Sequence, residues 1–239
     1  MKNPYLLTAA LALPLLSFAT SCSTVAGLRD SGPGEVDAGL LQYADESATD
    51  AVREARLEVA AEKDALEAVR LKLKDARQMR ELVNEREHVA EEQLDVAERR
   101  EQIASRNQVV EASAEMANER EAELRTARNR VKVYEQMIEA RERELDLAKA
   151  RVDHAQSIVQ LRMAEAVSGL QRKDANSIDV ADFEADVRDE RTNVELATTR
   201  FQGALRELKV SQKSFDGDVA LFPEMKEEFD SLLSQLKES

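Results

Sequence analysis

The feature that most constrains this 239-residue chain is an apolar residue at every seventh position from Leu82 to Ala166. Between Leu40 and Ser168 there is no glycine and no proline. A strict seven-residue apolar period is typical of α-helices that supercoil around one another. The series therefore predicts an all-α coiled coil. Its members are Leu82, Val89, Val96, Ile103, Val110, Ala117, Leu124, Val131, Ile138, Leu145, Val152, Val159 and Ala166.

A second series with the same period follows a polar stretch that begins after Ser168 and Gly169. A short polar connection makes consecutive helices antiparallel neighbours. We therefore expect a helical hairpin over 44–215: a long helix to about 168, a tip loop over 169–178 and a return helix over 179–215. Asp179 or Ser177 is placed to cap the return helix. The second series is Val180, Val187, Val194, Phe201, Leu208 and Phe215.

The last segment, 216–239, has the pattern of a short amphipathic helix. Asp216-Gly217-Asp218 ends the return helix, and Pro223 suits a first helical turn. We expect this helix to fold back onto the bundle. A membrane-surface helix is the alternative, although its polar face is acidic rather than basic.

The long helix would be on the order of 190 Å, whereas the return helix would cover only about 55 Å. Because a turn signal of glycine or proline is missing, we expect a continuous helix that associates with another chain. The alternative is a helix that folds back through Ser105-Arg106-Asn107, within 105–118. Upstream, a different seven-residue frame has two columns, and we expect a change of seam between Arg77 and Leu82. The columns are Val52, Val59, Leu66 and Leu73, and Ala55, Val69, Ala76 and Val83.

Arginines recur every 21 residues, at positions 99, 120, 141 and 162. They lie in the second column of the predicted seam and have acidic neighbours at helical spacing. We interpret them as solvated ion pairs rather than as a row of anion sites.

The first 21 residues have the pattern of a signal peptide. Lys2 precedes a mostly apolar stretch from Tyr5 to Phe18, and Ala19-Thr20-Ser21 leads to Cys22, the only cysteine. The apolar stretch is shorter than the ~20 residues that cross a bilayer, so we expect removal rather than a retained anchor. The small residues before the cysteine resemble the lipobox of bacterial lipoproteins. That resemblance implies cleavage before Cys22 and its modification by acyl chains such as palmitate; cleavage elsewhere, with a free thiol, is the alternative.

Among such lipoproteins an Asp after the cysteine commonly means retention in the inner membrane, and this chain has Ser23. In a host with two membranes the resemblance thus implies a lipid anchor on the periplasmic face of the outer membrane. Residues 22–43 contain several glycines and Pro33, which predicts a flexible tether between the anchor and the helices.

The composition argues against an enzyme or a nucleic-acid-binding protein. The formal net charge is −14, which repels nucleic acid. The two histidines, His88 and His154, are far apart in the sequence, and no glycine-rich phosphate loop occurs. We expect no catalytic residue, cofactor, metal or small-molecule substrate. Arg172 and Lys173 form a basic spot in the tip loop and are a candidate contact, with a solvated loop as the alternative.

Two functions remain. The first is a structural or scaffolding lipoprotein of the cell envelope, anchored through its lipid and homo-oligomeric or bound to another envelope protein. The second is an adaptor or chaperone-like module that clasps helices of another envelope protein through an unfilled seam between about 80 and 130.

Overall fold

The computed structural model describes residues 34–106, 111–170, 175, 178–214 and 223–236, which are helical and contain no strand. The prediction of an all-α helical hairpin is confirmed for these residues. In chain order they form the 3₁₀ helix η1 (Ala38–Tyr43) and the α-helices α1 (Glu46–Arg106), α2 (Glu111–Ser168), α3 (Val180–Ser214) and α4 (Pro223–Leu233).

The expectation of one continuous helix to about 168 is wrong. The helix ends at Arg106, a new one begins at Glu111, and the two pack along each other. Closing a short connection within one chain costs far less entropy than bringing two chains together, so α2 covers α1 before another molecule does. The chain thus reverses direction between Arg106 and Glu111 without glycine or proline.

Ion pairs between α1 and α2 show that the helices are antiparallel. Arg77 Nη2 lies 2.7 Å from Glu142 Oε1, and Arg128 Nη2 lies 2.7 Å from Glu91 Oε1. The residue numbers of each pair add up to 219, so the two helices keep one antiparallel register from Arg77 to Glu91. Such pairs contribute little stability each but select one register of an antiparallel coil.

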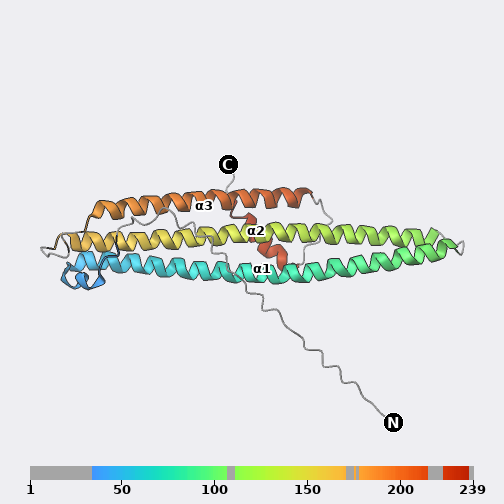
Figure 1. Ribbon diagram of the computed structural model, residues 1–239, viewed down its shortest axis with the longest axis horizontal. Helices are drawn as coiled ribbons and strands as arrows, with labels where there is room; N and C mark the ends of the chain where they lie inside the picture. Colours follow the sequence, from blue (N-terminus) through green and yellow to red (C-terminus); the bar gives the residue numbers. More distant parts are fainter. Residues whose placement is uncertain (1–33, 107–110, 171–174, 176–177, 215–222, 237–239) are drawn as a thin grey trace, which may run out of the picture. The chain divides into compact units, whose positions relative to one another are not determined.

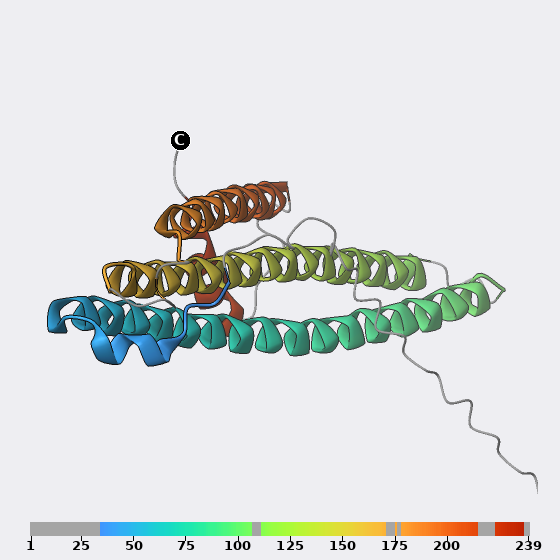
Figure 2. The same ribbon diagram turned by 60° about the vertical axis from the view of Figure 1, so that its left-hand side comes forward.

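α2 is the central helix of the arrangement, with α1 on one side and α3 on the other (Figures 1 and 2). The start of α3 is capped as the sequence predicts, because Asp179 Oδ1 accepts a hydrogen bond from the amide of Ala181 at 3.0 Å. The helix begins at Val180, so the predicted boundary is correct to one residue. Phe215, the last member of the second series, lies outside the described residues.

The core is divided into three hydrophobic clusters. The largest joins all four α-helices and is built around Tyr134, Met137 and Leu205, which are 0–1% exposed. A smaller one joins Leu66 of α1 to Ala148 and Val152 of α2. The third lies where α1 begins, α2 ends and α3 begins. Its buried members are Val36, Leu40, Val52, Met163, Ala164, Val167 and Phe183.

The third cluster corrects the predicted tether. Val36 and Leu40 are only 5% and 7% exposed, and the amide of Val36 donates to Gln160 Oε1 at 3.1 Å. The apolar side chains at these positions bury against α2 more favourably than they stay in water. The folded body therefore begins near Val36 rather than at 44.

α4 begins at Pro223, the predicted first-turn position. Its Phe229 and Leu232 are 1% and 0% exposed in the largest cluster, so this helix packs on the bundle as expected. Leu233 and Leu236 pack partly against the same cluster.

Candidate interaction surface

The four members of the apolar series on α1 are exposed, which contradicts the predicted seam. Leu82, Val89, Val96 and Ile103 have 51%, 49%, 46% and 59% of their surface exposed. They share one line along α1 because their spacing is seven residues. We refer to these four side chains as the α1 stripe.

The seam between α1 and α2 keeps the upstream frame instead of changing near Arg77. Ala76, Val83 and Ala97 lie seven or fourteen residues apart and are 0%, 2% and 3% exposed. The stripe begins one residue before Val83, about 100° away around the helix. Beyond Leu82, α1 therefore has two apolar faces, and α2 covers one of them.

The second column of that seam is polar at two successive positions in the same region before it returns to leucine at Leu94. Leu66 and Leu73 are buried, but the next positions at the same spacing are Arg80 and Glu87. Arg80 Nη2 lies 2.9 Å from Glu135 Oε1, and Glu87 Oε1 lies 3.5 Å from Arg128 Nε. Interhelical ion pairs thus replace leucine packing.

We call residues 82–106 of α1 and 111–132 of α2 the distal hairpin. Of its described residues, none between 84 and 130 belongs to a hydrophobic cluster, and the buried apolar side chains there are Ala97 and Leu124. Isolated helix pairs need a continuous apolar interface to be stable in water. The distal hairpin therefore has a thin core beside an uncovered apolar face.

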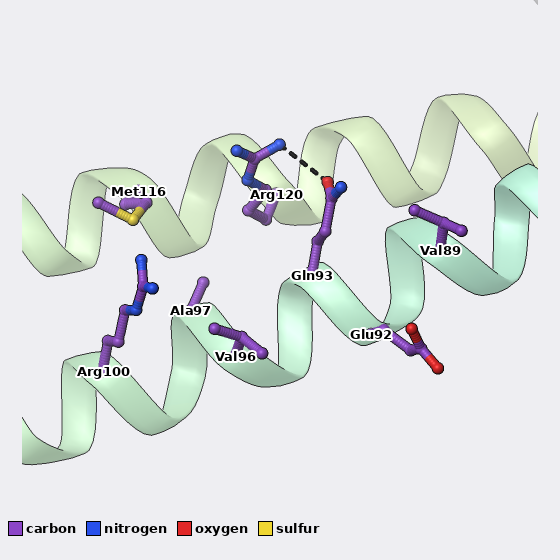
Figure 3. A pocket seen from close by; sticks show the side chains of 8 residues that line it. All are labelled: Val89, Glu92, Gln93, Val96, Ala97, Arg100, Met116 and Arg120. Carbon is purple, nitrogen blue, oxygen red and sulfur yellow. Dashed lines mark hydrogen bonds between the residues drawn. The ribbon is translucent and has the colours of Figure 1, made fainter.

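A groove of about 420 Å³ lies between the two helices of the distal hairpin (Figure 3). Val89, Val96 and Ala97 line it from α1. Arg120 of α2 donates to Gln93 Oε1 across it at 3.0 Å, and Arg100 points toward Met116. Met116 itself is 39% exposed, so the groove adds apolar surface next to the stripe.

The exposed ion pairs of the distal hairpin have one clear electrostatic effect. The hydrogen bond from Arg128 lowers the pKa of the Glu91 carboxyl below its ordinary value, and the same contact raises the pKa of Arg128. His88 adds a weaker attraction to Glu91. The pair favours the charged forms of both side chains and so supports the antiparallel register.

Arg141 is buried, which contradicts the interpretation of all four periodic arginines as solvated. Its side chain is 1% exposed and is the largest of the fully buried ones among the described residues. Nη1 lies 2.5 Å from Glu144 Oε2, and Nη2 lies 3.0 Å from Glu228 Oε1 of α4. Gln235 extends the cluster by donating to Glu144 Oε1 at 3.4 Å. Sequence periodicity gave no sign of this site, because α4 supplies both the cover and one carboxylate.

The predicted site residues Cys22, Arg172 and Lys173 lie outside the described residues. The described flanks of the predicted tip loop do locate its ends. Leu170 and Ile178 pack against the cluster that contains Val36 and Leu40. The end of α2 and the start of α3 therefore lie at the same end of the bundle as the start of the folded chain, and α1 ends at the opposite end.

The two histidines stay apart after the chain folds back. His88 lies beside Glu91, which is level with Arg128. His154 is 26 residues further along α2, about 39 Å away at the rise of an α-helix. In the described ranges no group of three or more His, Cys, Asp and Glu side chains is placed to hold a metal ion.

Comparison with protein-family models, with curated proteins and with solved structures gives no match for this chain. Among the residues that the structure describes, no helix combines the length and apolarity that crossing a membrane requires.

Proposed function

We propose that the chain is a structural lipoprotein of the bacterial cell envelope, anchored through acyl chains on Cys22. The observation that carries the proposal is the order of Lys2, the apolar stretch 5–18, three small residues and the single cysteine. Several acyl chains on one residue anchor a protein stably, whereas one chain alone is marginal. The long helices that follow suit a scaffold that presents a surface at a distance from its anchor.

Mass spectrometry of the N-terminal peptide from the membrane fraction tests the anchor. We expect cleavage before Cys22 and an acylated cysteine. Cys22→Ser, which keeps the leader and removes the sulfur, should leave the signal uncleaved and yield no acylated N-terminal peptide. An unmodified Cys22 in a protein released from membranes by buffer would contradict the proposal.

We further propose the periplasmic face of the outer membrane as its location, on the basis of Ser23. Separation of the two membranes on a density gradient should find the chain in the outer-membrane fraction. Ser23→Asp should move it to the inner membrane without changing acylation. If the native chain and the Ser23→Asp variant were distributed alike between the two membrane fractions, the proposed location would be refuted but the lipid anchor would not.

An adaptor that clasps helices of another envelope protein is the second candidate function. The exposed α1 stripe favours it, because a seven-residue apolar repeat is a surface on which another helix packs. Hydrogen exchange separates this candidate from a passive scaffold, since partner binding would protect the amides of the distal hairpin and leave those of α3 unchanged.

A further inference from the structure

We propose that the α1 stripe is the contact through which two copies of this chain associate, by packing α1 against α1 along the distal hairpin. The inference rests on the exposure and spacing of Leu82, Val89, Val96 and Ile103, and does not depend on the lipid anchor. From the sequence, self-association is expected because the long helix lacks a partner. In the structure α2 covers the seam of α1, and the reason for self-association is instead the exposed stripe.

The spacing defines what can cover the stripe. Four large aliphatic side chains at a seven-residue period extend over about 32 Å of helix, and knobs-into-holes packing requires the same period on the partner. A second copy presents that period over the same length. In a two-fold pair both stripes are buried in one contact, because the same surface patch serves both subunits.

The charges beside the stripe permit this contact in spite of the net charge of −14. The positions three and four residues after a stripe member flank the line on the two sides. After Leu82, Val89 and Val96 they hold two carboxylates, three guanidinium groups and one amide, so the flank lacks the acidic excess of the whole chain. These residues are Glu85, Arg86, Glu92, Gln93, Arg99 and Arg100.

The size of the contact fits a reversible dimer. Four side chains from each copy, over about 32 Å of helix, form a short contact compared with the ~1,200–2,000 Å² that stable specific interfaces bury. The thin core of the distal hairpin makes the gain larger for this segment than for the clustered half of the bundle, where α3 and α4 already add cover. Association through α1 would therefore stabilise the least supported part of the fold.

Light scattering of the full chain in mild detergent measures the association. We expect twice the chain mass at micromolar concentration and above, and half that value for the double variant Val89→Glu/Val96→Glu. Leu196→Glu is the matched control, because Leu196 on α3 is 49% exposed and outside the stripe. It should keep the dimer, and circular dichroism should show equal helix content in all three.

Two results would overturn the proposal: a wild-type chain that stays monomeric at every concentration, or a dimer that the double variant retains. A monomeric wild-type chain would mean that the α1 stripe is covered by a helix of a different protein. Dissociation by Leu196→Glu as well would also contradict it, since the effect would not be specific to the stripe.

Cysteine crosslinking in membranes gives a readout that does not depend on how the glutamate variants fold. Val89→Cys and Val96→Cys should form disulfides between chains, each with itself if the helices are parallel and with each other if they are antiparallel. Leu196→Cys and the native chain, whose single cysteine is Cys22, provide the background. Crosslinking at 89 and 96 no stronger than this background would refute the contact. Loss of acylation at Cys22 with retained crosslinking would refute the anchor alone.

Discussion

At the scale of single residues, charge complementarity in this protein fixes the alignment of helices more than it adds stability. Arg128 bridges Glu87 and Glu91 from the opposite helix, yet the Arg128 side chain is 54% exposed. Exposed pairs of this kind contribute little to stability. Their value is that a shift of α2 by one turn would separate them.

The lowered pKa of Glu91 makes this pair measurable. Because the folded pKa lies below the unfolded one, the carboxylate stabilises the fold above its ordinary pKa, and that contribution is lost as pH falls through the folded value. Arg128→Gln should raise the pKa of Glu91 toward its ordinary value, as followed by NMR titration of the side-chain carboxyl. Arg125→Gln, which breaks the pair with Glu121, should leave it unchanged. Equal pKa values of Glu91 in both variants would contradict the interhelical contact.

Residue patterns alone could not separate Arg141 from its periodic counterparts. Arg120 and Arg162 have an acidic residue three positions later, as Arg141 has Glu144, and both pair with it in partly exposed contacts. The difference lies in α4, which reaches Arg141 from 87 residues away in the sequence. Burial that depends on a distant element leaves no local signal.

At the scale of elements, the buried ion pairs of Arg141 with Glu144 and with Glu228 hold α4 in its orientation on the bundle. Removing one partner of a buried ion pair typically costs 3–5 kcal/mol, because the remaining charge stays buried without compensation. Arg141→Met should therefore lower the free energy of unfolding in urea by a few kcal/mol and speed hydrogen exchange over 226–233.

Arg143→Met is the matched control, since Arg143 is 43% exposed on the same helix and pairs only at 3.8–4.0 Å. It should change stability by less than about 0.5 kcal/mol. A similar loss in both variants would mean that α4 docks by its apolar side chains Phe229 and Leu232 and not by the ion pairs.

The helices themselves, the cap at Asp179 and the start of α4 at Pro223 could be predicted because they depend on local sequence. The choice of seam on α1 could not. Leu82 and Val83 are adjacent and both apolar. Leu82 begins one seven-residue series, and Val83 continues another from upstream. In the structure Val83 is buried with Ala76 and Ala97 in the seam with α2, whereas Leu82 is exposed, and local sequence does not distinguish the two series.

At the scale of the molecule, the decisive event is the reversal between α1 and α2. Spin labels at positions 93 and 120, whose native side chains are hydrogen-bonded, should lie within about 20 Å of each other. A continuous helix would separate them by about 40 Å. The labelled chain should be diluted with unlabelled chain so that distances between molecules do not contribute. A distance near 40 Å would mean that the chain forms one unbroken helix from 93 to 120.

The reversal also sets how far the chain can reach. The start of the folded body, the end of α2 and the start of α3 share one end of the bundle, whereas α1 ends at the opposite end. With 61 residues, α1 is a lever arm of about 90 Å, and a tilt of ten degrees at its base sweeps the far end through about 16 Å. The centre of the α1 stripe lies about 70 Å along this lever, so two copies that meet through their stripes can have the bases of their α1 helices up to about 140 Å apart. Copies held at this end would therefore meet over distances far larger than the width of the bundle.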